Sequence, residues 1–451
     1  MKKLLKSKIF FELILILAIV ISLIYYFYDQ NDTVTLKIGN EEYVFKKDET
    51  DKNLNLITLN SDYNTVIKSI KNKESIKVNG KNLIFKENLG KLKLNKNVSI
   101  KIDIKYKNDK DYTSYKINVL PDDFLDYETE GKSITNGDFY LTTYGSESGK
   151  GSYNYVFKLN NSGDVIFYRR VFKGTYIFKK ENINGTTYYS YLDYDNNEDK
   201  VNSLFILDEK YNVIKKVYNV DKNGEKIDIN PHDYIIKDLD DYIFLSGNDA
   251  LDDGNKSDFT IHEIKNNEII WEYKTKDYET DFKEELVFHF NSFDLDKDGN
   301  ILVSFRNVSK IICLDKDNGM LKYYIDGNTS EDLFSYQHSV INKNGKIYMF
   351  NNNAIGDKYS QNVGRSSSIV SFNYNEETKK IENYEKYNLN VFSVTMGSIF
   401  ISDDNTFLIA YGKNLESNIS NFEEIDSKTG NVLFKFKYDD SANATFRVYK
   451  F

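Results

Sequence analysis

The chain has 451 residues and a formal net charge of −9, with acidic and basic residues interleaved along its length. This distribution leaves no basic face on which a nucleic-acid backbone could release its counterions, so nucleic acid is excluded as a partner. Tyr, Phe, Ile, Asn, Lys and Asp are abundant, and the only prolines are Pro121 and Pro231. Such a composition favours pleated strands joined by polar turns and predicts an all-β fold.

The N-terminus predicts a membrane anchor. Residues 1–8 form a basic tail with four lysines, and residues 9–28 are almost uninterrupted apolar sequence. A helix of this length spans about 30 Å, the thickness of the hydrocarbon core of a bilayer, and the lysines favour a cytoplasmic tail. The aromatic residues 25–28 offer no small-residue cleavage site, which favours a signal anchor over a cleaved signal peptide. We therefore expect a single-pass protein of the cell membrane whose remaining residues are extracytoplasmic.

Residues 29–120 predict a small β-sandwich. Short alternating stretches such as 33–38 and 98–104 are separated by turns rich in Gly, Asn and Asp, until Pro121 ends the pattern. The only cysteine is Cys313, so no intramolecular disulfide can form and the fold depends on packing. If the protein forms a homodimer, this N-terminal domain is the expected pairing surface.

Residues 121–451 carry two interleaved series of hairpin turns, each repeating at a spacing of about 50–60 residues. Two series at one period imply four strands in each repeat, and four-stranded units bury both faces when they stack radially. The sequence therefore predicts a six-bladed β-propeller, with a sandwich or a solenoid as the alternatives. The first series lies near Asn160, Asp208, Lys265, Lys316, Asn375 and Ser427, and the second near Asp240, Asp298, Asn344 and Asp404.

Three of the four histidines share nearly the same phase of this repeat. His232, His289 and His338 each stand shortly before a second-series turn, which places them on equivalent strands of three successive blades. If these strands are the innermost ones, the imidazoles converge at the mouth of the central channel. Arg306 follows the turn after His289 and would direct a fixed cation into the same space. Histidines at equivalent positions of a repeat can also be buried for purely structural reasons. The additional arginine favours a functional site.

Other positions fit this pattern less well. His262 is out of phase and is predicted to lie at the surface. The equivalent place in the following blade is occupied by Thr395-Met396-Gly397. Residues 294–299 begin like a calcium loop, but Phe305 occupies the position that requires a carboxylate, so this segment is interpreted as a hairpin turn.

Five segments resemble, in order, the motifs of the bacterial aryl-sulfate sulfotransferases. The resemblance runs from about residue 119 to near residue 447, and although each motif alone is weak, five in order are specific. It implies a six-bladed propeller behind an N-terminal β domain, and a cofactor-free reaction that moves a sulfuryl group from an aryl sulfate donor to a phenolic acceptor through a sulfohistidine. The segments are Pro231-His232-Asp233, Phe288-His289-Phe290-Asn291-Ser292, Ser304-Phe305-Arg306-Asn307, Tyr336-Gln337-His338-Ser339 and Gly364-Arg365-Ser366-Ser367.

The resemblance also implies roles for the matched residues. His338, in the Gln-His motif, corresponds to the nucleophile, and no metal is implied. The other implied catalytic residues are His232, His289 and Arg306, and the implied substrate-binding residues are Asn291, Thr395 and Arg365. The chain departs from the family, whose members are commonly soluble secreted proteins and often carry a cysteine pair.

Three other functions fit parts of the pattern. Three histidines with an open fourth position would suit a catalytic zinc hydrolase, although Arg306 would repel a divalent ion. A non-catalytic surface propeller that binds a ligand or partner would retain the histidines only as structure. A quinone-cofactor dehydrogenase is disfavoured, because that class depends on repeated tryptophans and this chain has only Trp271.

Overall fold

The structure is a computed structural model. The predicted tail and anchor, residues 1–28, lie outside the described residues apart from Val20, and none of the helices in the described part has the length and apolarity to cross a bilayer. The structure describes residues 20, 32–38, 41–47, 51–56, 64–70, 73–78, 80–82, 89–93, 99–121, 124–143, 154–171, 175–194, 201–248, 258–275, 289–328, 332–356, 358–402, 406–412, 420–439 and 444–451.

The described residues are almost entirely strands and turns, which confirms the all-β fold class. They form two compact units, Met1–Asp122 and Asp123–Phe451. The sequence analysis placed the boundary between residues 120 and 121. Pro121 is the last residue of strand β9, which belongs to the first unit.

The described part of the first unit contains two sheets. In β1, Val34 and Leu36 are buried and alternate with partly exposed residues, and in β8 Ile102 and Ile104 are buried. One sheet has the order β2 (Glu41–Lys46), β1 (Thr33–Ile38), β4 (Asn64–Ile70) and β7 (Leu89–Lys93). The other has the order β3 (Asp51–Leu56), β9 (Thr113–Pro121), β8 (Ser99–Tyr106), β5 (Lys73–Val78) and β6 (Lys81–Asn82).

The described part of the second unit contains six antiparallel sheets of four or five strands, here called sheets 1 to 6. Sheet 1 contains β36 (Tyr449–Lys450), β11 (Phe139–Thr142), β12 (Asn154–Leu159) and β13 (Val165–Val171). Sheet 2 contains β14 (Phe178–Ile183), β15 (Thr186–Tyr194), β16 (Asn202–Leu207) and β17 (Val213–Val217). Sheet 3 contains β20 (Ile235–Asp238), β21 (Asp241–Asn248), β22 (Asp258–Lys265) and β23 (Glu268–Lys274).

Sheet 4 contains β24 (Phe290–Leu295), β25 (Ile301–Phe305), β26 (Lys310–Leu314) and β27 (Leu321–Asp326). Sheet 5 contains β28 (His338–Lys343), β29 (Lys346–Asn351), β30 (Ser368–Asn375) and β31 (Lys380–Asn388). Sheet 6 contains β32 (Ser398–Ile401), β33 (Thr406–Ala410), β34 (Phe422–Asp426), β35 (Val432–Tyr438) and the added strand β10 (Tyr127–Gly131). A short pair, β18 (Asn219–Val220) and β19 (Lys226–Ile227), follows sheet 2, and one 3-10 turn, η2, spans Tyr359–Gln361.

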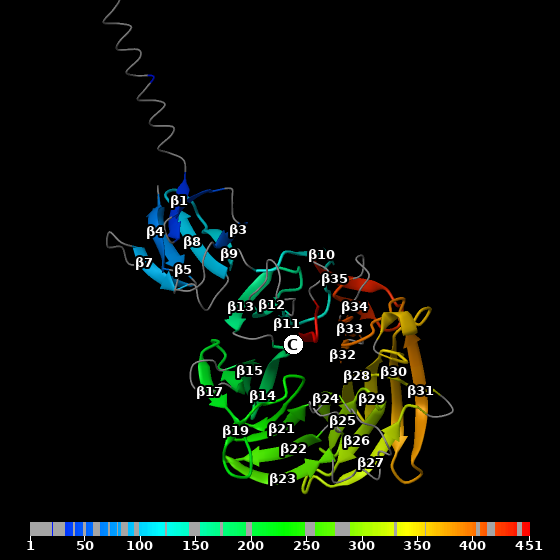
Figure 1. Cartoon of the computed structure of the whole chain (residues 1–451). Coiled ribbons are helices and arrows are strands. Elements are labelled where there is room, and N and C mark those ends of the chain that lie inside the picture. The colour runs from blue at the N-terminus through cyan, green and yellow to red at the C-terminus, as the bar shows by residue number, and fades with distance from the viewer. Residues whose placement is uncertain are drawn as a thin grey trace, which may run out of the picture. The chain divides into compact units, whose positions relative to one another are not determined.

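The six sheets are arranged around a common centre like the blades of a propeller, with the first strand of each sheet inside and the last outside (Figure 1). All six first-series turns join the third and fourth strands of a sheet, as predicted. The second-series turns near Asp240, Asp298 and Asn344 join first and second strands, while Asp404 lies outside the described residues. The equivalent turn of sheet 2, at Asn184-Gly185, was missed.

The C-terminal strand β36 completes sheet 1 by pairing with β11. Beside it the ammonium of Lys450 lies 2.8 Å from the carboxylate of Glu424 on sheet 6, and both side chains are almost fully buried. The Thr135 hydroxyl donates to the same carboxylate oxygen at 2.6 Å. The end of the chain therefore joins the first sheet to the last.

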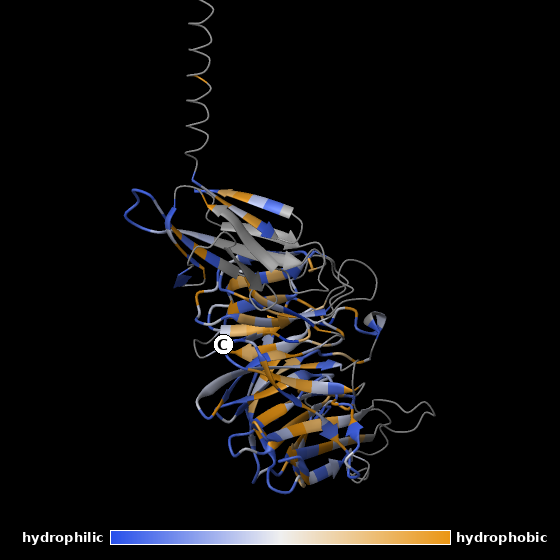
Figure 2. Cartoon of the chain, turned by 90° about the vertical axis from the view of Figure 1, so that its left-hand side faces the viewer, coloured by the Kyte–Doolittle hydropathy of each residue, from blue (hydrophilic) through white to orange (hydrophobic). Residues whose placement is uncertain are grey.

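Apolar side chains fill the spaces between neighbouring sheets. One cluster joins sheets 3 and 4 and another joins sheets 4 and 5. Every residue of β25 and of β26 is buried, because both faces of these strands are covered. Each large apolar side chain buried in this way contributes about 1.5–3 kcal/mol. Figure 2 shows the apolar residues concentrated in the strands and the hydrophilic residues in the turns.

The prediction that His262 lies at the surface was wrong. His262 is 1% exposed in β22, and its Nε2 atom forms a hydrogen bond with the Asn219 side chain of β18. Packing between sheets buries the middle of such a strand on both faces, so a residue can be far from the channel and still be removed from water.

Candidate active site

The three in-phase histidines stand at the start of the first strands of sheets 3, 4 and 5. His232 lies just before β20, His289 directly precedes β24, and His338 is the first residue of β28. Because neighbouring strands are antiparallel, each second strand ends where the first begins. Arg306 directly follows the second strand of sheet 4 and Asn352 follows that of sheet 5, so these side chains gather at the same end of the sheets.

Contacts within the site bring the four predicted catalytic residues into one cluster. The ring centroids of His232 and His289 lie 5.2 Å apart in an edge-to-face arrangement. The guanidinium carbon of Arg306 lies 4.6 Å from the ring centroid of Tyr336, whose carbonyl oxygen is 3.2 Å from Nδ1 of His338. Arg306, His289 and His232 all act electrostatically on His338.

The hydrogen bonds of His338 fix its tautomer. The side chain is 2% exposed, and its Nδ1 atom lies 2.7 Å from Oδ1 of Asn352. The amide nitrogen of Asn352 donates to the carbonyl oxygens of Ser393 and Met396, both at 2.9 Å, which leaves Oδ1 as the atom that faces the imidazole. An amide oxygen only accepts, so Nδ1 carries the hydrogen and Nε2 keeps its lone pair.

His232 is held in the same way. Oδ1 of Asn230 accepts the backbone N–H of His232 at 3.1 Å and lies 2.7 Å from its Nδ1. Nδ1 of His232 therefore also carries the hydrogen. The imidazole packs beside Tyr176 and Phe446, with ring centroids at 5.1 and 5.5 Å, and these two aromatic rings stack on each other.

Both imidazoles are neutral near pH 7. Burial lowers the pKa of His338 well below its ordinary value, and the electrostatic effects of Arg306 and His289 lower this pKa further, against the hydrogen bond that His338 donates to Asn352. Burial likewise lowers the pKa of His232 well below its ordinary value, with His289 and Arg447 acting in the same direction. A neutral imidazole with a free lone pair is the nucleophilic and basic form of histidine.

Arg306 is 5% exposed, and hydrogen bonds from two guanidinium nitrogens hold its side chain in place. Nη1 donates to Oδ1 of Asn307 at 2.7 Å and Nη2 donates to the carbonyl of Val394 at 3.0 Å. Tyr336, on which it stacks, has a left-handed backbone with φ 54°, an unusual conformation for a bulky residue.

Left-handed backbone recurs around the site, at His289, Ser339 and Met396. Such conformations cost of the order of 1–3 kcal/mol each and persist where the surroundings impose them. These strained residues lie near the starts of the first strands of the sheets. Their backbone conformations orient the side chains of the site at the expense of stability.

The three predicted substrate-binding residues lie around this cluster. Asn291 is completely buried, and its amide nitrogen donates to the carbonyl of Gln337 at 2.7 Å, so it supports the backbone next to His338. Arg365 donates through Nη2 to Oδ1 of Asn353 at 2.9 Å. Thr395 stands between Val394, whose carbonyl accepts from Arg306, and Met396, whose carbonyl accepts from Asn352.

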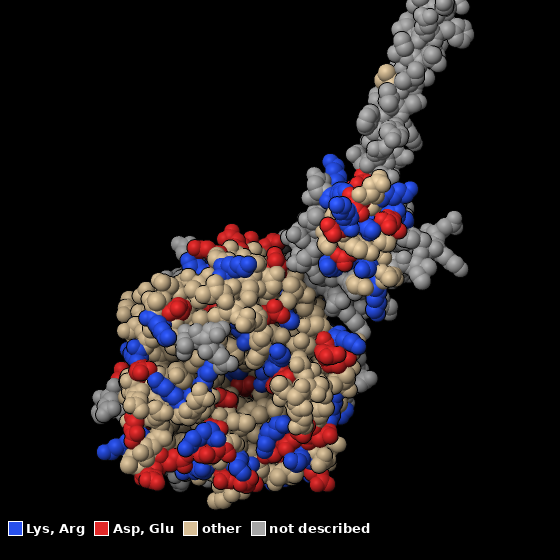
Figure 3. All heavy atoms as spheres, turned by 180° about the vertical axis from the view of Figure 1, so that it is seen from behind, with Lys and Arg blue, Asp and Glu red and all other residues tan. Residues whose placement is uncertain are grey.

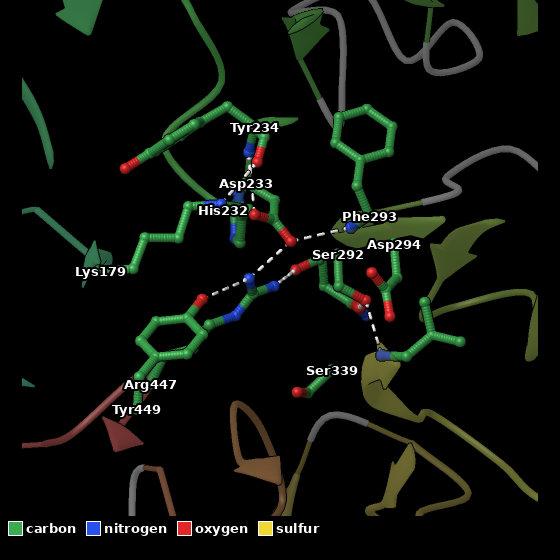
Figure 4. A network of polar contacts seen from close by, with 12 residues as sticks. Lys179, His232, Asp233, Tyr234, Ser292, Phe293, Asp294, Ser339, Arg447 and Tyr449 are labelled. Atoms are coloured by element: carbon green, nitrogen blue, oxygen red, sulfur yellow. Dashed lines mark hydrogen bonds and ion pairs between the residues drawn. The ribbon is translucent and has the colours of Figure 1, made fainter. Parts of the chain in front are cut away.

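Asp233 and Arg447 were missed as site residues. The guanidinium of Arg447 donates from Nη1 to the Asp233 carboxylate and from Nη2 to the carbonyl of Asn291 (Figure 4). Asp233 stands beside His232 in a quoted motif, which was a usable signal. Asn352 was missed as well, and its run of three asparagines, residues 351–353, gave no such signal.

A cavity of about 230 Å³ is lined by residues from the first strands of all six sheets, and its lining includes Asp233 and Ser339, which follow His232 and His338 in the chain. Lys179 and Glu181 face it from β14, with their charges 3.5 Å apart. Asp294 faces it from β24, and burial raises the pKa of this carboxyl to about 6. Figure 3 shows a hollow at the centre of one face of this unit, with acidic and basic side chains around it.

Among the described residues, one candidate group of metal ligands lies at the turn end of sheets 4 and 5. Oxygen atoms of Asp296, Asp298 and Glu376 lie within 4.8 Å of one another, with two of these residues exposed. Oδ1 of Asp296 already accepts the backbone N–H groups of Asp298 and Asn300, both at 2.8 Å. The segment forms the hairpin turn that the sequence predicted.

Comparison with solved structures finds matches at low sequence identity. A protein of unknown function from Bacteroides caccae is 14% identical, covering 69% of this chain and 100% of that one, with a TM-score of 0.39. A quinonprotein alcohol dehydrogenase-like protein from Bacteroides thetaiotaomicron is 12% identical, covering 92% and 99%, with a TM-score of 0.38. An inactive virginiamycin B lyase from Staphylococcus aureus is 10% identical, covering 69% and 99%, with a TM-score of 0.33. TM-scores this low carry no functional argument.

Comparison with curated proteins gives no significant match. The family model described as arylsulfotransferase (ASST) matches residues 136–438, a segment that includes all seven predicted site residues. This match covers more than half of the chain and confirms the resemblance seen in the motifs. The chain belongs to the arylsulfotransferase (ASST) family.

Proposed function

We propose that this protein transfers a sulfuryl group from an aryl sulfate to a phenol, by two displacements through a sulfohistidine at His338. The observation that carries the proposal is the hydrogen bonding of His338, which leaves a neutral Nε2 lone pair beside Arg306 in a buried site. Family membership supports sulfotransferase chemistry in general. The two-step route through His338 is the proposed part.

In the first displacement, Nε2 of His338 forms a bond to sulfur while the bond from sulfur to the aryl oxygen breaks and its electron pair leaves with the phenolate. Negative charge on the sulfuryl oxygens and the leaving oxygen is stabilised by a fixed cation, and Arg306 is already held in place by Asn307 and Val394. A preorganised donor of this kind is worth about 3 kcal/mol in the transition state.

In the second displacement, the oxygen of the acceptor phenol attacks sulfur and the bond to Nε2 breaks. The phenol must lose its proton, and neutral His232 is the base that we assign to this step, since Asn230 holds its hydrogen on Nδ1. Protonated His232 then returns the proton to the phenolate that leaves in the next cycle. The stacked pair of Tyr176 and Phe446 offers an apolar wall for an aryl group beside this base.

The six sheets are proposed to close into one six-bladed ring, supported by the pairing of β36 with β11 and by the buried ion pair of Lys450 and Glu424. The basic tail and apolar run of residues 1–28 support a single-pass protein of the cell membrane with an extracytoplasmic catalytic domain. If the protein forms a homodimer, we propose that residues 29–120 form the pairing surface.

The test uses full-length protein, a chromogenic aryl sulfate as donor and a second phenol as acceptor. The proposal expects release of the donor phenol, formation of the acceptor sulfate, and parallel lines in double-reciprocal plots. His338→Gln should abolish both products, while His262→Gln, a matched change of a histidine outside the site, should retain them at pH 7.5. Absence of transfer by wild-type protein, or full transfer by His338→Gln, contradicts the proposal.

A further inference from the structure

The contact between His338 and Asn352 is fixed by the surroundings of Asn352. Asn352 is 0% exposed, and its side chain forms three hydrogen bonds that no apolar residue could make. Two backbone carbonyls, of Ser393 and Met396, accept from its amide nitrogen and exclude the flipped orientation, because a flip would place oxygen against oxygen. The amide oxygen is therefore locked toward Nδ1 of His338.

We propose that Asn352 is the positioning residue of the reaction: it holds the hydrogen of His338 on Nδ1 and so keeps the lone pair on Nε2. This inference rests on the proposed function, in which Nε2 is the nucleophile. The carbonyl of Tyr336 also lies near Nδ1, but at 3.2 Å it is the longer contact. Without Asn352 the imidazole would lose its short hydrogen bond and could carry its hydrogen on Nε2, the wrong atom for attack.

The choice of an amide rather than a carboxylate matters after the first displacement. When Nε2 bonds to sulfur, Nδ1 keeps its hydrogen and the ring becomes cationic. The amide oxygen of Asn352 stabilises this charge through the hydrogen bond but is too weak a base to remove the proton. The ring therefore remains a good leaving group, and when the acceptor oxygen bonds to sulfur the electron pair of the N–S bond returns to Nε2.

The location of Asn352 fits this role. It directly follows the second strand of sheet 5, at the place where Arg306 follows the second strand of sheet 4. Its partners Ser393 and Met396 flank Val394, whose carbonyl holds Arg306. One segment, residues 393–396, therefore holds both the Asn352 amide and the Arg306 guanidinium in place.

The direct test is the tautomer of His338 in full-length protein labelled with ¹⁵N-histidine. Two-bond ¹H–¹⁵N correlations separate the Nδ1–H from the Nε2–H form, and the chain has four histidines, so His338→Gln identifies the relevant signals. Wild-type protein should show the hydrogen on Nδ1. A hydrogen on Nε2 of His338 in the wild type overturns the proposal without any variant having to fold.

Variants separate positioning from a merely structural role. Asn352→Ala should move His338 toward the Nε2–H form and lower kcat at least about 100-fold, with little change in KM for the donor. Asn352→Asp restores an acceptor toward Nδ1 and should recover the Nδ1–H form only in part, because its second carboxylate oxygen faces the carbonyls of Ser393 and Met396 in place of the amide nitrogen. The control is Asn230→Ala, which should change the signals of His232 and leave those of His338 unchanged.

An Asn352→Ala protein that loses activity but keeps the Nδ1–H form overturns the positioning role. A wild-type Nδ1–H form together with an absence of sulfuryl transfer leaves the positioning geometry intact and counts against the proposed function alone. The two proposals therefore fail in distinguishable ways.

Discussion

Asp233 and Arg447 form a buried ion pair, with Oδ2 of the carboxylate 2.5 Å from Nη1 of the guanidinium and side-chain exposures of 3% and 7%. Asp233 precedes the first strand of sheet 3 and Arg447 precedes the C-terminal strand of sheet 1. The same carboxylate oxygen accepts the backbone N–H of Phe293 on sheet 4 at 2.8 Å. The pair therefore connects three sheets next to His232 (Figure 4).

Arg447→Met should destabilise the protein by about 3–5 kcal/mol, because it leaves the Asp233 carboxylate buried without its counter-charge. The measurement is equilibrium unfolding in urea. Adding Asp233→Asn should recover a large part of the loss, since the uncompensated charge is then removed. Lys435→Met is the control: its partner Glu130 is 76% exposed, so its effect should be close to zero. If Arg447→Met and Lys435→Met lowered the free energy of unfolding equally, burial would not explain the effect of the Asp233–Arg447 pair.

The buried His262 should make stability depend on pH. Burial lowers the pKa of His262 to about 4, against an ordinary value near 6.5. The unfolded chain therefore binds a proton at higher pH than the folded protein, so stability is lost as pH falls from about 6.5 to 4 and not above that range. The contribution is up to about 3 kcal/mol.

His262→Gln isolates this effect, because the other buried histidines are unchanged. Unfolding in urea at pH 7.5 and at pH 4.5 should show a smaller acid-induced loss in His262→Gln than in the wild type. The same acid-induced loss in both proteins would show that His262 is not the sensitive group.

The pH dependence of catalysis should follow the lowered pKa values of His338 and His232. Since burial and neighbouring positive charge favour the neutral rings, kcat/KM for an aryl sulfate should stay constant as pH falls through 6.5 and decline only at lower pH. The profile is measured on wild-type protein with a chromogenic donor. A decline centred at pH 6.5 would mean that these rings titrate like exposed histidines.

Arg306→Met should lower kcat/KM by about 100-fold or more, because it removes a preorganised cation from the sulfuryl oxygens. It should also move the acidic limb of the pH profile to higher pH, since the charge of Arg306 lowers the pKa of His338. Arg306→Lys retains the charge but loses the two-sided contact with Asn307 and Val394, so the rate should fall while the position of the limb changes less. An Arg306→Met enzyme with an unchanged profile would place Arg306 outside the reaction.

Much of the fold could be predicted because it depends on local patterns. Turn residues such as Asn160 and Asp208 mark hairpins through their own side-chain hydrogen bonds, which is a signal visible in sequence. The phase of the three histidines followed from the same repeat. The turn at Asn184-Gly185 was missed, although Asn-Gly is a pair typical of tight hairpin turns.

What could not be predicted depends on contacts between sheets. Arg447 meets Asp233 across 214 residues, and Asn352 is identified by two backbone carbonyls in the segment between sheets 5 and 6. The burial of His262 likewise depends on Asn219, which lies outside the propeller repeat. No spacing along the chain encodes such pairs.

The measurement that tests the central claim most directly is mass spectrometry of the full-length protein, quenched shortly after mixing with an aryl sulfate and no acceptor. The account predicts a mass increase of one sulfuryl group, mapped to the peptide that contains His338, and its disappearance when a phenol is added before the quench. His338→Gln should acquire no adduct. A sulfuryl group on a different residue, or turnover with no adduct on His338, would contradict the account.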